Sequence, residues 1–97
     1  ELLLSDSALS DLKEIKSFYH DQGVPNVALE HIKTVLSKAE NLLTHPGMGR
    51  VVPEFNEPNI RELIVNPYRV VYLQGKDYIQ IIRVWRRERL MKPIKTD

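Results

Sequence analysis

The sequence contains no cysteine among its 97 residues. This absence excludes a disulfide framework, a thiolate metal site and a cysteine nucleophile. Long apolar runs are missing as well, because none approaches the roughly 20 residues that a membrane-spanning helix needs. Residues 1–4 are apolar apart from the first, but they are too few for the core of a signal peptide. We therefore expect no membrane partner and a cytoplasmic location.

Features that hold metals and cofactors are also missing. His20, His31 and His45 do not have zinc-ligand spacing, and no cluster of carboxylates accompanies them. The sequence has no glycine-rich phosphate loop and no nucleophile-elbow motif. We therefore expect neither a metal nor a cofactor.

Length and composition indicate one folded domain, residues 1–97. The net charge of +1 is unevenly divided along it. Residues 1–59 hold five basic and nine acidic residues, giving −4, whereas residues 60–97 hold nine basic and four acidic residues, giving +5. This split indicates an anionic partner for the C-terminal half. The alternative is a chance fluctuation in a well-mixed surface.

The first half of the chain has the apolar period of two helices. Ser5 or Ser7 can cap the first helix, Gly23 ends it, and Pro25 suits the first turn of the second. The short link at residues 21–24 then predicts an antiparallel helical hairpin. Two apolar stripes repeat at alternating spacings of four and three: Ala8, Leu12, Ile15 and Tyr19, then Ala28, Ile32, Val35, Ala39 and Leu42.

The second half has the composition of strands. Ile60–Val65, Tyr68–Gln74 and residues 78–85 are rich in β-branched and aromatic residues, and Leu2–Leu4 offers one further strand. Residues 47–59 contain two glycines and two prolines, which predicts a loop. The expected fold is α+β, with an N-terminal strand and a two-helix antiparallel hairpin packed on an antiparallel sheet of three to four strands.

A predicted register places arginines together on one face of the sheet. If the last hairpin closes around residues 75–77, Arg69 lies opposite Arg83, and Arg61 of the preceding strand joins them. Like charges are unfavourable there unless an anion or a partner's carboxylate lies between them. Replacing Arg69 and Arg83 by Ala should then weaken binding without unfolding the chain. The alternatives are a register shifted by one residue, or pairing with internal carboxylates such as Glu54, Glu57 and Glu62.

The C-terminal stretch is the second candidate binding feature. Residues 83–95 contain six basic residues and one acidic residue, interleaved with large apolar side chains. Arginine next to tryptophan favours binding to phosphates, bases or a protein groove. The alternative is a solvated chain end with the tryptophan in the core. The candidate residues for binding a target or a partner are Arg61, Arg69, Arg83, Trp85, Arg86, Arg87 and Arg89.

Five stretches, taken in order, resemble the RelE/ParE toxin superfamily over nearly the whole chain. They are residues 5–15 (SDSALSDLKEI), 45–50 (HPGMGR), 60–65 (IRELIV), 68–72 (YRVVY) and 78–87 (YIQIIRVWRR). The resemblance implies a helical hairpin on one face of an antiparallel sheet. It also implies a cognate antitoxin that wraps and neutralises the toxin. Operator DNA would be contacted only indirectly, through the antitoxin.

The superfamily has two branches with different targets. RelE-like members cut mRNA on the ribosome, and the resemblance would give Arg61, Arg69 and Arg83 the scissile phosphate, with Arg86 nearby. Some of these nucleases carry His or Tyr just after the last strand. The corresponding residues here include Arg86, a poor general base.

The ParE-like branch inhibits DNA gyrase and has no known nuclease chemistry. The long hairpin of residues 5–44 is also more similar to this branch. We therefore expect a toxin that inhibits growth by binding a large target, with gyrase favoured. A ribosome-dependent mRNA endoribonuclease is the alternative, and a non-toxic module in operon regulation is the third possibility.

Overall fold

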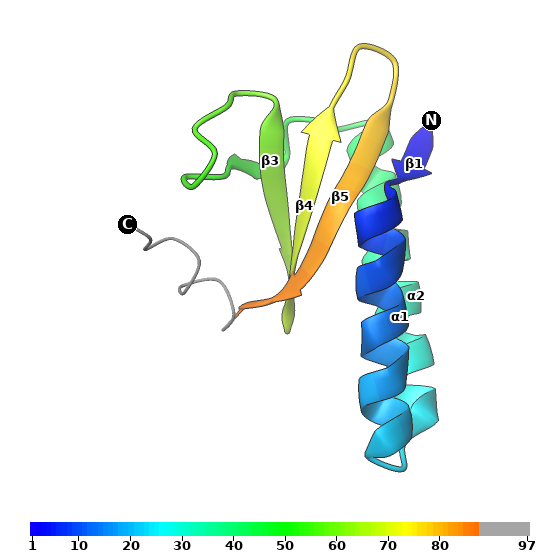
Figure 1. Ribbon diagram of the computed structural model, residues 1–97. Helices are drawn as coiled ribbons and strands as arrows, with labels where there is room; N and C mark the ends of the chain where they lie inside the picture. The colour runs from blue at the N-terminus through cyan, green and yellow to red at the C-terminus, as the bar shows by residue number, and fades with distance from the viewer. Residues whose placement is uncertain (88–97) are drawn as a thin grey trace.

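The computed structural model describes residues 1–87 of the chain. Two helices pack on one face of a five-stranded sheet whose strand order is β1-β5-β4-β3-β2 (Figure 1). Neither helix within residues 1–87 is long and apolar enough to cross a membrane. In chain order the elements are β1 (Leu2–Leu4), α1 (Asp6–Asp21), α2 (Pro25–Glu40), the 3-10 helix η1 (Asn41–Leu43), β2 (Arg50–Val51), β3 (Ile60–Val65), β4 (Tyr68–Gln74) and β5 (Ile79–Arg86).

The predicted starts of both helices and the end of the first are confirmed, and their caps explain them. The second helix ends at Glu40, before the predicted end at residue 44, and η1 follows it. The Ser5 hydroxyl accepts a hydrogen bond from the Ala8 backbone N–H at 3.0 Å, which satisfies a donor in the first turn of α1. Gly23 follows α1 with a φ of 80°, a conformation that glycine adopts without strain. Pro25 then occupies the first turn of α2. The two helices therefore form the expected antiparallel hairpin.

The core lies between the hairpin and the sheet. Both predicted apolar stripes face inward. Tyr19 and Ile32 are partly buried, and the other residues of the two stripes are buried. Burial of each large aliphatic side chain contributes about 1.5–3 kcal/mol to folding. The buried residues of this cluster are Ala8, Leu12, Ile15, Ala28, Val35, Ala39, Val65, Tyr68, Val70, Ile81 and Val84.

The sheet is larger than expected and mixed in direction. β3 and β4 have the predicted bounds, and β1 is present, but β1 pairs with β5 in parallel. Within the segment 47–59, which was predicted to be a loop, β2 adds two residues to the edge of β3. Two residues are too few to show a period of two, so the sequence pattern did not reveal this strand.

The β4–β5 register differs from the predicted one. The hairpin closes with a hydrogen bond of 2.9 Å from the Gly75 N–H to the Tyr78 carbonyl, which sets Gln74 opposite Ile79. A bulge on β5 then shifts the pairing by one more residue. Arg83 consequently lies opposite Val71 and Arg69 lies opposite Trp85, so the predicted Arg69–Arg83 pair is wrong.

Candidate functional site

The sheet has one face without helices, which we call the open face. Its side chains are fixed by the register, because paired residues and every second residue along a strand share a face. Three rows cross this face: Ile60, Leu73, Gln80 and Leu3; then Glu62, Val71 and Arg83; then Ile64, Arg69 and Trp85.

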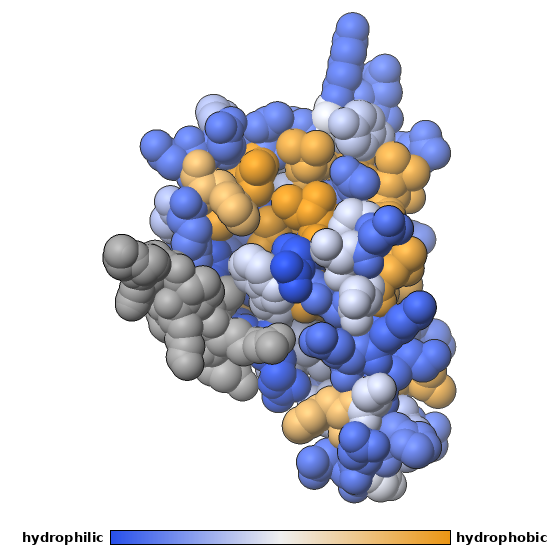
Figure 2. Space-filling model, in the orientation of Figure 1, coloured by the Kyte–Doolittle hydropathy of each residue, from blue (hydrophilic) through white to orange (hydrophobic). Residues whose placement is uncertain are grey.

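Part of the open face is apolar. Leu3 and Ile64 are 36% and 39% exposed, and Phe55, on the loop between β2 and β3, is 44% exposed. Apolar side chains gather over the upper part of the sheet in Figure 2. Large apolar groups on a surface are typical of sites where another protein binds.

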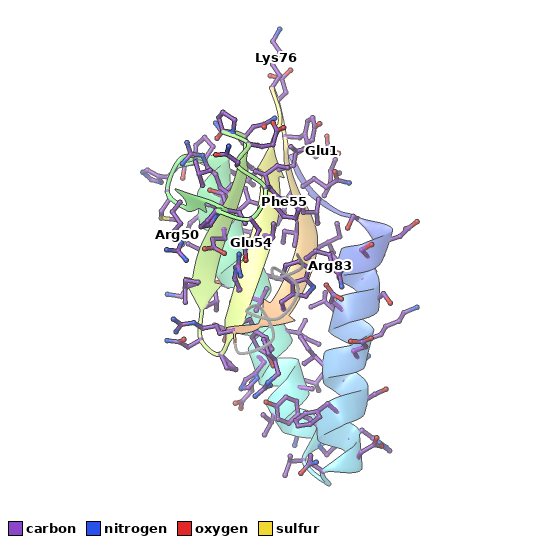
Figure 3. All side chains as sticks on the ribbon, turned by 60° about the vertical axis from the view of Figure 1, so that its left-hand side comes forward. Glu1, Arg50, Glu54, Phe55, Lys76 and Arg83 are labelled. Carbon is purple, nitrogen blue, oxygen red and sulfur yellow. The ribbon has the colours of Figure 1, made fainter. Side chains whose placement is uncertain are left out.

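Charged side chains form a closed network in the middle of this face. Arg69 donates from Nε to Glu62, and from Nη2 to the Oε1 atom of Glu54 at 2.6 Å. Arg50 on β2 donates to the other oxygen of Glu62. Figure 3 shows the loop that carries Glu54 and Phe55 lying over the sheet. Two arginines and two carboxylates therefore neutralise one another.

The burial of its central residues indicates that this network supports the fold. Arg69 is 4% exposed and Glu62 is 1% exposed. Burial alone would lower the pKa of Arg69, but its hydrogen bonds to Glu54 and Glu62 reverse the direction and raise it. The hydrogen bond from Arg69 also holds the pKa of Glu54 below its usual range. An ion pair this deep destabilises the fold strongly when one partner is removed.

Arg83 is held by a different carboxylate. It donates from Nε and Nη2 to the two oxygens of Asp11 on α1, both at 2.8 Å. Asp11 also accepts the backbone N–H of Val84 at 2.8 Å. The hydrogen bond to Asp11 raises the pKa of Arg83 against the opposing effect of burial. The Arg83 side chain is 38% exposed and lies 4.9 Å from the centre of the Trp85 ring.

Arg61 does not join Arg69 and Arg83. It lies opposite Tyr72, which packs with Leu42 on the helix side of the sheet, so Arg61 faces away from the other two. It donates from Nη1 to the Gly49 carbonyl at 2.9 Å. The predicted cluster of three arginines is therefore wrong. The side chain of Arg61 lies on the opposite face of the sheet, and internal carboxylates pair with Arg69 and Arg83.

The remaining candidate residues follow along the end of β5. Trp85 is half-buried on the open face, and Arg87 is exposed and donates to the Asn66 side chain at 2.7 Å. Arg86 points to the helix side, where it donates to the Tyr19 hydroxyl at 3.1 Å. The last candidate, Arg89, lies outside the described residues.

Arg86 belongs to a pocket between α1 and the ends of β4 and β5, which we call the α1 pocket. Its volume is about 260 Å³. The Arg86 guanidinium lies 5.5 Å from the centre of the Phe18 ring and 5.7 Å from that of Tyr68. Ile15 and Val84 complete the apolar wall, and Asp11 and Glu14 add carboxylates on the α1 side.

The α1 pocket and the contacts behind it involve residues that the sequence did not single out as functional. Tyr19 and Tyr68 were expected in the core and the sheet, and His31 was set aside. The structure joins them: His31 Nδ1 lies 2.8 Å from the Tyr68 hydroxyl, and its ring meets Tyr19 edge to face. The only sequence signal was the adjacent pair Phe18-Tyr19, which does not reveal a partner 49 or more residues away on β4.

The Tyr68 hydroxyl is a fixed hydrogen-bonding group in this arrangement. Burial raises the pKa of Tyr68 and the neighbouring Tyr19 adds to the rise, so the Tyr68 hydroxyl keeps its proton near neutral pH. Within residues 1–87 no group of three or more His, Cys, Asp or Glu side chains is placed to hold a metal ion. The exposed apolar residues and the arginines of β5 are the features that a partner protein would contact.

A family model and a solved structure agree on the proteins that this chain resembles. The model of the family described as ParE toxin of type II toxin-antitoxin system, parDE, matches residues 2–91. A solved structure described as the chromosomal ParDE TA system from P. aeruginosa contains a chain with the same fold. The TM-score is 0.74 at 24% identity, over 89% of this chain and 94% of that one. No curated protein sequence matches the chain.

Proposed function

The chain belongs to the family of ParE toxins of type II toxin–antitoxin systems, and from this membership we propose that it arrests growth by binding DNA gyrase. The proposal includes neutralisation by a cognate antitoxin. Such a target would place its action in the cytoplasm. The ParE branch of the superfamily, to which the family model belongs, is the branch whose members inhibit gyrase.

One observation on the open face favours target binding over RNA cleavage. A nuclease of the RelE type needs arginines that are available to a phosphate in the reaction. Here Arg69 is buried between Glu54 and Glu62, and Arg83 donates from Nε and Nη2 to the two oxygens of Asp11. Releasing either one would leave a carboxylate unpaired. This pairing favours a role of the two arginines in the fold over a role at a scissile phosphate.

The antitoxin is proposed to cover the open face. The exposed apolar side chains of Leu3, Phe55 and Ile64 call for an amphipathic segment. Arg83 on β5, whose side chain is 38% exposed, and the exposed Arg87 just after this strand favour acidic residues in the same segment. An antitoxin segment with both properties matches this surface in polarity and charge.

A supercoiling assay tests the proposal directly. The purified full-length chain is added to gyrase and relaxed plasmid in increasing molar ratio. We expect supercoiling to be inhibited in a dose-dependent manner, and to recover when the chain is first mixed with the antitoxin encoded beside it. That mixture is the matched control, because it contains the same amount of toxin.

Three outcomes would contradict the proposal. Undiminished supercoiling at a large molar excess of the chain would exclude gyrase as the target. Cleavage of mRNA on purified translating ribosomes, in the same preparation, would identify the ribosome-dependent endoribonuclease instead. Normal growth on strong expression without antitoxin would favour a non-toxic regulatory module.

A further inference from the structure

Arg61 is a half-buried arginine that no carboxylate of residues 1–87 neutralises. Its side chain lies on the helix side of β3 and donates from Nη1 to the Gly49 carbonyl at 2.9 Å. Its Nε atom is buried, and no atom of the described residues accepts a hydrogen bond from it. A positive charge next to an unsatisfied buried donor favours an anion from outside the chain.

The other arginines of the sheet differ from Arg61 in this respect. Arg50, Arg69 and Arg83 each donate to a carboxylate of the same chain. An anion that approached one of these three would compete with a carboxylate that is already bound. At Arg61 it would compete only with a backbone carbonyl, which carries no net charge.

Arg61 lies beside an edge strand with exposed apolar side chains, and we call Met48, Val51 and Arg61 the β2 edge site. In the part of the sheet that the structure describes, β2 pairs only with β3. Val51 lies opposite Arg61 and is 37% exposed, and Met48, which is 49% exposed, precedes the residue whose carbonyl binds Arg61. Because Val52 donates to the Ile60 carbonyl, the alternation of antiparallel strands turns the Val51 N–H and C=O away from β3.

This combination suits a peptide segment better than a nucleic acid. A nucleic-acid backbone carries a phosphate at every nucleotide, and binding it takes a groove lined with cations. The arginine of β2, Arg50, lies on the opposite face and is bound to Glu62. An extended peptide instead needs unpaired backbone groups along an edge and contacts for alternate side chains, both of which the β2 edge site offers.

Charge also disfavours a second copy of the chain as the occupant. A symmetric contact places the same surface on both sides of the interface. Two copies joined at the β2 edge site would therefore bring Arg61 of each copy towards the other, and like charges repel. A partner of a different sequence that carries a carboxylate has no such penalty.

We propose that an extended segment of the antitoxin lies along the β2 edge site and binds Arg61 through an Asp or Glu carboxylate. The inference rests on the proposed pairing with an antitoxin and names the chemistry of one contact. The segment pairs with the Val51 backbone and covers the side chains of Met48 and Val51. Because Arg50 on the same strand faces the open face, one antitoxin chain can reach both surfaces.

The affinity of Arg61 variants for the purified antitoxin tests the proposal. Arg61→Gln removes the charge but keeps a polar side chain, and the dissociation constant measured by calorimetry should rise roughly tenfold or more. Added salt should weaken binding of Arg61→Gln less than binding of the unaltered chain, because one ion pair is lost. Arg61→Lys keeps the charge, so it should retain the salt dependence and part of the affinity. A role of Arg61 in folding alone would leave the salt dependence of binding unchanged.

Lys76→Gln is the matched control. It removes the same charge at the exposed β4–β5 turn, which Figure 3 shows well apart from Arg50 on β2. Its dissociation constant should stay within about twofold of that of the unaltered chain. Equal losses of affinity in Lys76→Gln and Arg61→Gln would mean that the antitoxin responds only to net charge, and the β2 edge site would be refuted.

A double-mutant cycle identifies the carboxylate. Each Asp and Glu of the antitoxin is replaced by Ala in turn and titrated against the unaltered chain and against Arg61→Gln. One replacement should weaken binding to the unaltered chain several-fold and have almost no further effect on Arg61→Gln.

The outcomes that overturn the inference are distinct from those that overturn the proposed function. An unchanged dissociation constant for Arg61→Gln, or the lack of any coupled carboxylate, would refute the site while the pairing with the antitoxin stands. Loss of affinity for single-stranded RNA alone would assign Arg61 to phosphates instead. If the unaltered chain itself does not bind the antitoxin, the proposed function fails and the inference fails with it.

Discussion

Asp11 and Arg83 join α1 to β5 at the point where the sheet loses its edge strand. β1 pairs with β5 only as far as Ile81, and beyond it the Asp11 carboxylate accepts the Val84 N–H as a neighbouring strand would. The same carboxylate binds both Nε and Nη2 of Arg83. A helix residue thus completes the hydrogen bonding of an open strand edge.

Loss of the Asp11 carboxylate should destabilise the fold. Asp11→Ala leaves a buried backbone N–H and a half-buried guanidinium without their acceptor, and each such group costs about 1–3 kcal/mol. Asp11→Asn keeps one acceptor oxygen and should cost less. Urea unfolding followed by circular dichroism measures both variants. Equal stability of Asp11→Ala and the unaltered chain would show that the contact adds nothing.

Arg69 is expected to be essential for folding, which changes the expectation drawn from the sequence. The sequence suggested that Arg69 and Arg83 could both become Ala without unfolding. Arg69→Ala instead leaves Glu62 buried beside only one arginine, and breaking such a pair costs about 3–5 kcal/mol. Thermal unfolding should show a large loss of stability.

Arg50→Ala serves as the control for Arg69→Ala. It removes the other arginine that contacts Glu62, but the Arg50 side chain is 69% exposed. Solvent screens a guanidinium this exposed, so its loss should cost less than the loss of the buried Arg69. Similar losses of stability in the two variants would mean that burial does not determine the strength of this network.

Acid should weaken the attachment of the loop through Glu54. Its pKa is lower in the folded chain than the ordinary 4.5, because Arg69 stabilises the ionised form. The stabilisation is therefore fully present above that ordinary value and is lost as the pH falls through the lowered pKa. Denaturant midpoints measured from about pH 7 to about pH 3 should fall less steeply for Glu54→Gln than for the unaltered chain. Identical slopes would contradict the contribution of Glu54.

The segment before β2 depends on Tyr72. Its hydroxyl donates to the Pro46 carbonyl at 2.8 Å and accepts the Gly49 N–H at 3.0 Å. Tyr72→Phe should cost about 1–3 kcal/mol because both backbone groups lose their partner. Gly49→Ala should be at least as harmful, since a Cβ atom there would lie 2.4 Å from the Glu62 carbonyl oxygen. If neither variant changes the free energy of unfolding measured in urea, Tyr72 does not stabilise the segment before β2.

Local patterns in the sequence predict the elements of this fold well. The spacing of Leu12 and Ile15 gave the buried face of α1, and Ser5, Gly23 and Pro25 gave the ends of the helices. These signals work because each depends on residues within one or two turns of the chain. The bounds of β3 and β4 follow from their β-branched and aromatic composition in the same way.

The candidate site was harder to predict, because it depends on pairing between distant segments. The hairpin closes one residue away from the predicted register, and a bulge on β5 adds a second one-residue shift, so Arg83 does not face Arg69; no local pattern marks that bulge. The partners Asp11 and Arg83 are 72 residues apart. The contact of Arg86 with Tyr19 spans a similar distance and requires the hairpin to be folded onto the sheet.

Induction of the chain in cells without the antitoxin tests the central claim most directly. Plasmid topology and the integrity of a reporter mRNA are measured in the same arrested culture. Gyrase binding predicts that the plasmid loses negative supercoils while primer extension shows uncut transcripts. Normally supercoiled plasmid together with codon-linked cuts in the mRNA would contradict the account.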